Sequence, residues 1–122
     1  MSLLLDTHAI VWWDNGKLPK RVVARIQRAN EVFVSAATAW EIAIKSALGK
    51  IRVRGQMADV LADYGFRELP ISIAHADAVR MLPNLHRDPF DRMLVAQASV
   101  EGLAIVSNDE LLASYPVKVV WD

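Results

Sequence analysis

Four carboxylic acids that stand next to strongly apolar segments are the residues best able to do chemistry in this chain. They are Asp6, Glu41, Asp91 and Asp109. A charge beside core-forming sequence is costly unless something compensates it, and four acids gathered together raise one another's pKa values. A hard divalent cation such as Mg²⁺ relieves both costs, because it prefers carboxylate oxygens as ligands. The four acids therefore predict a metal site, and with it a hydrolase of phosphodiesters.

Length and composition limit the protein that could position these acids. The chain has 122 residues, so one domain spanning 1–122 is expected. Hydrophobic residues make up 53 %, which indicates a partner interface in addition to a core. Trp12 and Trp13 cannot face the same way on a helix, so one of them is expected to contact a partner.

Cysteine usage and hydropathy predict the class of protein and its location. The chain has no cysteine, which excludes disulfides and thiolate metal sites. No apolar stretch approaches the roughly 18 residues that a membrane span needs, and the N-terminus lacks a secretory signal pattern. A cytoplasmic protein that does not contact membranes is expected.

Basic residues are balanced by acids but are clustered along the sequence. Lys and Arg number 14, as do Asp and Glu, so the net charge gives no support to nucleic-acid binding. The two clusters are Lys17, Lys20, Arg21, Arg25 and Arg28, and Lys45, Lys50, Arg52 and Arg54. Each could contact phosphates, or could be a solvated helix face and a polar loop. The sequence leaves both interpretations open.

Apolar runs that alternate with helical segments predict an α/β fold whose parallel sheet is covered on both faces. Strands are expected at 2–6, 32–35, 66–71, 103–106 and 117–120, and helices at 7–14, 19–30, 36–48, 56–64, 72–82, 89–101 and 109–114. Ligands of such sheets bind beyond the carboxyl ends of the strands. Two of the four acids follow strands and two lie on adjacent helices, so all four are expected at one pole.

Asp6 and Glu41 also have ordinary structural explanations. Asp6 could cap the helix that follows it, although Thr7 could do so instead. Glu41 could form a surface ion pair with Lys45 at i, i+4. The stripe of Thr38, Glu41 and Lys45 on an otherwise apolar helix suits a cleft equally well. In a cleft, Lys45 would hold either a phosphate or Glu41.

The remaining two acids lie near helix starts. Asp88, followed by proline, is explained as the N-cap of the 89–101 helix, which places Asp91 at its third position. Asp91 is therefore the better candidate for the site. Ser107 and Glu110 predict a capping box, which would leave Asp109 free to point at a ligand.

The three histidines carry less information. His8 is expected near the site or in the core, and His75 as a solvated helix residue. His86 precedes the predicted cap on a loop and could approach a substrate. No pair has the spacing of a zinc site such as His-Glu-x-x-His.

Four segments of the chain together resemble one family. They are LLDTH at 4–8, WEIAIK at 40–45, HRDPFDRMLVAQA at 86–98 and VSND at 106–109. In order and spacing they resemble the PIN domain, and most of all the VapC-type toxins of toxin–antitoxin systems. The resemblance covers essentially the whole chain, and the His-x-Asp-Pro-Phe-Asp-Arg segment is specific to that branch. It implies a three-layer α/β/α fold with a central parallel sheet of four to five strands.

The resemblance also implies an activity and a set of site residues. It implies a Mg²⁺-dependent ribonuclease, with Mn²⁺ as the other cation, in which Asp6, Glu41, Asp91 and Asp109 are the catalytic and metal-binding acids. Ser107 matches a hydroxyl position that is threonine in many relatives, so the hydroxyl is kept. Secondary positions are Thr7, Lys45, Asp88 and Arg92.

The mechanism and partners follow from the same resemblance. Asp6 and Asp91 are expected to be the primary ligands of one or two ions, while Glu41 and Asp109 complete the shell or position the attacking water. The metal lowers the pKa of that water, and in-line attack on RNA leaves a 5′-phosphate. A homodimer is expected, neutralised by a small antitoxin whose tail covers the acidic cleft.

Three alternatives belong to other classes. A catalytically inactive PIN scaffold would only bind a partner, and the intact set of acids argues against it. A phosphoacceptor receiver domain needs an acidic pair after the first strand and a lysine after the last, whereas Thr7 and His8 follow Asp6 and Lys118 lies inside a predicted strand. A haloacid-dehalogenase-type phosphatase needs Asp-x-Asp, and His8 occupies the second position.

Overall fold

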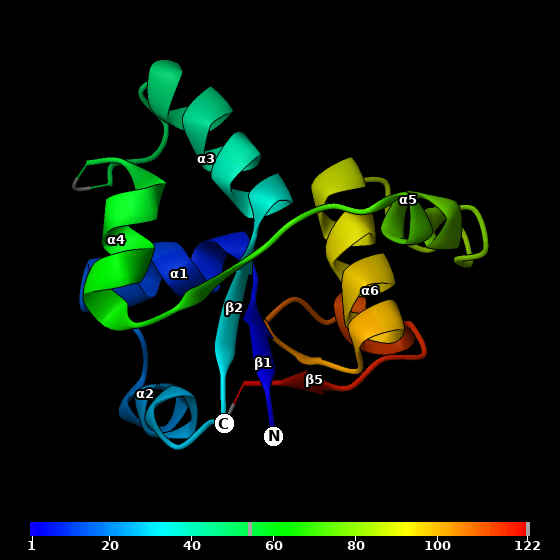
Figure 1. Ribbon diagram of the computed structural model, residues 1–122, viewed down its shortest axis with the longest axis horizontal. Coiled ribbons are helices and arrows are strands. Elements are labelled where there is room, and N and C mark those ends of the chain that lie inside the picture. Colours follow the sequence, from blue (N-terminus) through cyan, green and yellow to red (C-terminus); the bar gives the residue numbers. More distant parts are fainter. Residues whose placement is uncertain (54, 122) are drawn as a thin grey trace.

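The computed structural model describes residues 1–53 and 55–121, and its centre is a sheet of five parallel strands (Figure 1). The strands are β1 (Leu3–Leu5), β2 (Val32–Ser35), β3 (Arg67–Leu69), β4 (Ala104–Val106) and β5 (Val119–Val120). Their order is β3-β2-β1-β4-β5. The strand order therefore reverses between β1 and β4, which is where a parallel sheet opens a crevice beyond its carboxyl ends. Arg54 of the second basic cluster lies outside the described residues.

Six α-helices and one 3₁₀ turn are assigned among the described residues, in the predicted order. They are α1 (Thr7–Asp14), α2 (Lys20–Gln27), α3 (Ala36–Ala47), α4 (Met57–Tyr64), α5 (Ile73–Val79), α6 (Pro89–Glu101) and η1 (Leu112–Ser114). Several predicted ends are wrong. The 19–30 helix is confined to 20–27, since Pro19 is its cap, and the 109–114 segment becomes helical only at 112.

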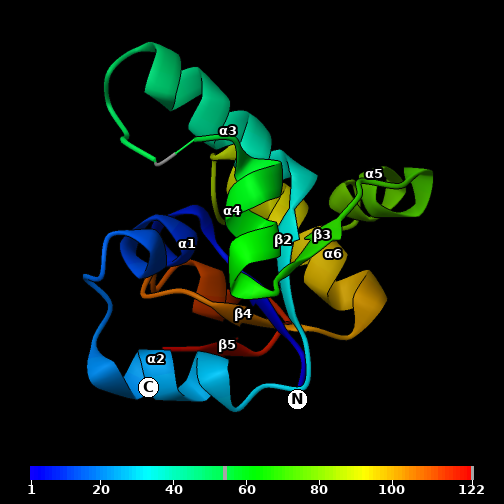
Figure 2. The ribbon, with the colours of Figure 1, turned by 60° about the vertical axis from the view of Figure 1, so that its left-hand side comes forward.

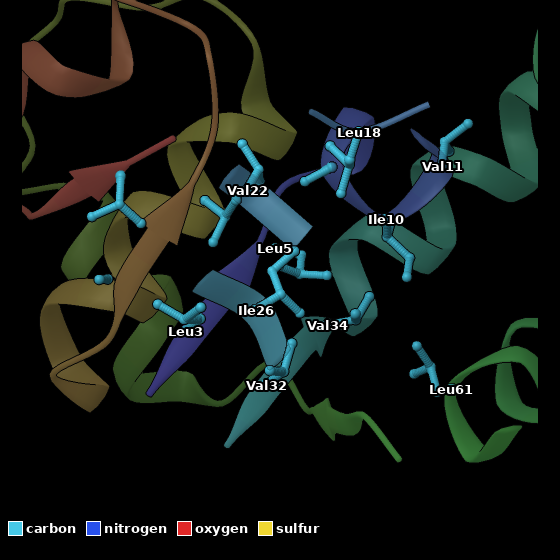
Figure 3. Close-up of a cluster of buried hydrophobic side chains, with 14 of the residues drawn as sticks. Leu3, Leu5, Ile10, Val11, Leu18, Val22, Ile26, Val32, Val34 and Leu61 are labelled. Atoms are coloured by element: carbon cyan, nitrogen blue, oxygen red, sulfur yellow. The ribbon is translucent and has the colours of Figure 1, made fainter. Parts of the chain in front are cut away.

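Alternate strand residues pack on opposite faces of the sheet. Leu3 and Leu5 join a cluster with residues of α1, α2 and α4, shown in Figure 3, whereas Leu4 joins a second cluster with residues of α6 and η1. Since both faces are covered, each strand is apolar throughout. Figure 2 shows α1, α2 and α4 on one side of the sheet and α5 and α6 on the other. The predicted three-layer fold is confirmed.

Side-chain caps fix the starts of the helices that surround the carboxyl edge. Asp6 follows β1 and accepts the Ala9 N–H at 2.8 Å, which begins α1. Ser35 ends β2 and accepts the Ala37 N–H at 3.0 Å, which begins α3. Because strand and helix are joined directly at both places, α1 and α3 start at one edge of the sheet.

His75 is not the solvated residue that the sequence predicts. It is 2 % exposed, because α5 packs against α6. Its Nδ1 accepts the Ser72 N–H at 3.0 Å, and its Nε2 lies 2.8 Å from Oε2 of Glu101. His75 therefore completes the capping box of α5 and ties that helix to α6.

The tryptophans differ in exposure. Trp12 and Trp13 are both half-buried against the first core cluster, so a partner contact by one of them stays a prediction. Trp40 of α3 is 63 % exposed. Within residues 1–53 and 55–121, the helices are too short or too polar to traverse a bilayer.

Candidate metal centre

Asp6 lies buried at the carboxyl end of the central strand, with 5 % of its surface exposed. Burial raises the pKa of this carboxyl above its ordinary value, while hydrogen bonds from the Ser107 hydroxyl and the Ala9 N–H favour the charged form. The negative charge of Asp109 raises the same pKa further. The cap that the sequence suggested for Asp6 is thus real, and Ser107 and Asp109 lie close to the same carboxylate.

Glu41 reaches the same pole from α3 and is also 5 % exposed. Its Oε1 accepts a hydrogen bond from the Thr7 hydroxyl, and its Oε2 lies 2.7 Å from Nζ of Lys45. The i, i+4 pair with Lys45 is therefore formed, but its acid is buried rather than at the surface. The bond to Glu41 raises the pKa of Lys45, and the charges of Asp88 and Asp91 act in the same direction.

Asp91 is the acid on which the others converge. It occupies the third position of α6, and its side chain is 20 % exposed. Burial, followed by the charge of Asp88, raises its pKa to about 7. Asp6 and Glu41 raise the same pKa, whereas His86 lowers it. The predicted meeting of Asp6, Glu41 and Asp91 is therefore present in the structure.

Asp109 follows β4 and faces a histidine. Its Oδ2 lies 3.0 Å from Nε2 of His86, and that nitrogen lies 3.3 Å from Oδ2 of Asp91. The three ligand-type atoms all lie within 4.8 Å of one another. His86 was expected only to approach a substrate, and its place between two acids was missed. The one signal in the sequence is its position two residues before the Asp88 cap.

The turn around Asp109 differs from the predicted capping box. The Ser107 hydroxyl accepts the Asp109 N–H at 3.0 Å, and Oδ1 of Asp109 accepts the Leu111 N–H at 2.9 Å. The box with Glu110 is wrong, because the helical turn begins only at Leu112. Asp109 is thus part of the turn and also presents its second oxygen to the site.

Two of the secondary residues, Asp88 and Arg92, form hydrogen bonds that shape the segments around the site. Oδ1 of Asp88 accepts the Phe90 and Asp91 N–H groups, as its predicted cap role requires. The guanidinium of Arg92 donates to the Pro83 carbonyl at 2.9 Å and to the Tyr115 hydroxyl at 3.2 Å. The hydrogen bonds of Arg92 therefore brace the segment before α6 and do not reach the acids.

The donor set fits a divalent cation. The carboxylates of Asp91 and Asp109 lie close together, and Asp6 interacts electrostatically with both of them. Oxygen ligands of this kind suit Mg²⁺ and Mn²⁺. A cation at this pole would offset the repulsion between the acids.

An apolar cavity of about 620 Å³ lies beside His86. Its lining includes Trp40 and Phe90, whose ring centroids lie 5.2 Å apart, and it also includes His86 and Met93. From Trp40 an exposed apolar stripe continues along α3 through Ile44 to Leu48, the C-cap residue of the helix. The helix that buries Glu41 on one side thus exposes large hydrophobic side chains on another.

Known proteins resemble the chain over nearly its whole length. It is 28 % identical over 123 residues to Ribonuclease VapC22 of Mycobacterium tuberculosis, covering 93 % of this chain and 92 % of that protein. Its fold matches VapBC2 from Rickettsia felis bound to a promoter DNA fragment, with a TM-score of 0.76, 16 % identity and full coverage of both chains. It also matches a toxin–antitoxin complex from Klebsiella pneumoniae, with a TM-score of 0.66, 15 % identity and coverage of 97 % and 95 %. Residues 3–118 match the PIN domain, and the chain belongs to that family.

Proposed function

We propose that this PIN-domain protein is a metal-dependent endoribonuclease that serves as the toxin of a toxin–antitoxin system. The observation that carries the proposal is the convergence of four acids from four separate elements at the carboxyl pole of the sheet. Likeness to a protein named as a VapC ribonuclease supports the same activity. The proposed location is the cytoplasm, where an RNA substrate would be found.

The four acids have different proposed roles, which follow from their surroundings. Asp6 and Asp91 are the proposed primary ligands of Mg²⁺ or Mn²⁺, because burial raises the pKa of both and the charge of Asp6 raises that of Asp91 further. Glu41 and Asp109 complete the shell or orient the attacking water. A bound cation lowers the pKa of a water molecule and offsets charge on the phosphodiester. Thr7 and Lys45 hold Glu41 in place, and Ser107 holds Asp6.

The second basic cluster is the proposed contact for RNA phosphates. Lys45 pairs with Glu41 at the site, and Lys50 and Arg52 lie exposed in the segment after α3. Figure 1 shows α3 extending beyond the carboxyl edge of the sheet, whereas α2, with much of the first cluster, lies at the other end. Phosphates approaching the acids would therefore meet the second cluster and not the first.

Cleavage of a defined RNA tests the activity. The wild-type chain should cleave in Mg²⁺ or Mn²⁺ and stop in EDTA. Asp6→Asn and Asp91→Asn should each lose roughly 1,000-fold or more of the rate, since residues that act as a unit are not replaceable singly. Glu110→Gln, at an exposed acid just beyond Asp109, is the matched control and should cleave normally. Undiminished cleavage by both asparagine variants would refute the site.

A small antitoxin is the proposed protein partner. Solved structures that resemble this fold include a toxin–antitoxin complex. The partner should cover the acidic pole and stop RNA cleavage at one-to-one stoichiometry. A small open reading frame directly upstream is the place to find its gene. A wild-type chain that binds this partner and cleaves no RNA would instead support the inactive-scaffold alternative.

A homodimer is proposed through the apolar stripe of α3. Trp40, Ile44 and Leu48 recur at i, i+4 and i+8, so they share one helix face. Exposed apolar side chains at Ile71 and Ile73 extend the apolar surface near the cavity. A patch of this kind can pair with its own copy about a two-fold axis, which buries the same residues on both chains.

A further inference from the structure

The imidazole of His86 bridges two acids from different elements. Its Nε2 lies 3.0 Å from Oδ2 of Asp109, in the turn after β4, and 3.3 Å from Oδ2 of Asp91, in the first turn of α6. The first distance is that of a hydrogen bond, and the second is that of a close contact between the ring nitrogen and the carboxylate. The bridge therefore links the two sides of the crevice.

The other ring nitrogen fixes which tautomer is present. The backbone N–H of Asp88 points at Nδ1 of His86, 3.1 Å away, so Nδ1 must accept. In a neutral imidazole the proton then resides on Nε2, which faces the two carboxylates. His86 in this arrangement donates to Asp109 and lies 3.3 Å from Asp91, and its Nε2 has no lone pair to offer a cation.

The segment that carries His86 is itself held on two sides. The His86 N–H donates to the hydroxyl of Tyr115 at 2.8 Å, and Tyr115 is buried. Arg92 donates to the same hydroxyl and to the Pro83 carbonyl. The imidazole is therefore placed by α6, by the residue after η1 and by its own loop, and not by one flexible contact.

We propose that His86 is a positioning residue, which sets the separation of the Asp91 and Asp109 carboxylates for a divalent cation by donating its Nε2–H to Asp109 while the same nitrogen contacts Asp91. The inference rests on the proposed metal-dependent function and adds a residue to it. Hydrogen bonds to metal-binding carboxylates orient them, and their removal typically weakens metal affinity about 10- to 100-fold. The acids keep their remaining lone pairs for the cation, while His86 stays outside its coordination sphere.

Mn²⁺ affinity, measured by calorimetry on the full chain, tests this role with two matched substitutions. His86→Gln places an amide N–H near the Nε2 position and should bind Mn²⁺ within a few-fold of wild type. His86→Asn keeps an acceptor near Nδ1 for the Asp88 N–H but has no donor that reaches the acids. It should bind about 10- to 100-fold more weakly. Asn84→Ala, in the same loop, should bind as wild type does.

Each other result has a definite meaning. Equal affinity of wild type and His86→Asn, at equal melting temperatures, would overturn the positioning role. Tighter binding by His86→Asn would also overturn it, since His86 would then compete with the cation. Pulsed electron paramagnetic resonance of the Mn²⁺ complex should show no directly coordinated nitrogen, and a coupled imidazole nitrogen would make His86 a ligand instead. A wild-type chain that binds no Mn²⁺ would overturn the proposed function itself.

Discussion

Oδ1 of Asp88 accepts the backbone N–H of Asp91 at 3.1 Å, so the residue that caps α6 also shapes the turn from which Asp91 enters the site. The same oxygen accepts the Phe90 N–H at 2.8 Å. Asp88 acts on Asp91 a second time through its charge, which raises the Asp91 pKa. One side chain therefore fixes the position of its neighbour and makes the neighbour's negative charge harder to form.

Two substitutions separate the cap from the charge. Asp88→Ser keeps a side-chain acceptor for the helix start, whereas Asp88→Ala does not, and both remove the negative charge. Asp88→Ala should unfold with about 1 kcal/mol less free energy than Asp88→Ser in urea. Equal stabilities would mean that the side-chain cap at position 88 does not contribute to the stability of the helix.

The raised pKa of Asp91 predicts a pH-dependent stability. The folded carboxyl keeps its proton up to about pH 7, whereas the unfolded chain releases it near the ordinary value of 3.8. The folded state therefore holds the extra proton in this window, and without metal the stability contributed by this group falls as the pH rises through it. The fall should be on the order of 4 kcal/mol between pH 4 and pH 8. Urea unfolding in EDTA at several pH values measures it.

Asp91→Asn is the control for that pH dependence, because an amide keeps the shape and cannot ionise. Its unfolding free energy should vary less with pH over the same window and should exceed that of wild type at pH 8. Identical pH profiles for the two proteins would show that Asp91 ionises normally in the folded state.

A divalent cation should reverse this destabilisation. At pH 8, Mn²⁺ at one hundred times its dissociation constant should stabilise wild type by about 2.7 kcal/mol, since it binds only the folded state. EDTA should return the melting temperature to its starting value. Asp91→Asn should gain much less at the same Mn²⁺ concentration. An equal gain in both proteins would place the bound ion elsewhere.

The apolar stripe of α3 predicts a dimer that charges can break. Ile44→Glu combined with Leu48→Glu should change the mass in solution from dimer to monomer, as light scattering after size-exclusion chromatography would measure. The melting temperature of the monomeric variant should change little, because both substituted side chains are exposed. Ser46→Glu, also exposed but on another face of α3, should leave the dimer intact. A wild-type chain that is monomeric at all concentrations would contradict the stripe as an interface.

Local chemistry explains where sequence-based prediction worked. The predicted bounds of α1, β2 and α6 match the structure, and α6 has a signal at each end, with Asp88 as its cap and Gly102 in the left-handed conformation after it. The strands alternate with helices, so the pole at which the acids meet followed from topology alone. Signals that act within a few residues of one another can be read from a single sequence.

The missed features depend on contacts between distant segments. The bridge from His86 to Asp109 exists because Tyr115 and Arg92 hold the segment before α6 against the end of the chain. The burial of His75 requires α5 to pack on α6. The short, irregular pattern of residues around His75 does not predict this packing. Both histidines gained their roles from packing that the sequence does not encode locally.

Thr7 and Thr38 form a matched pair for testing how Glu41 is held. Both threonines are buried, but the Thr7 hydroxyl donates to Glu41, whereas the Thr38 hydroxyl has no hydrogen-bond partner in the part of the chain that the structure describes. Thr7→Val leaves a buried carboxylate oxygen without its donor and should lower the unfolding free energy by about 1 to 3 kcal/mol. Thr38→Val removes a hydroxyl that gains nothing from burial and should be neutral or stabilising. Urea unfolding of the two variants at one pH gives the comparison. Equal stabilities of the two variants would show that the hydrogen bond from Thr7 to Glu41 does not stabilise the fold.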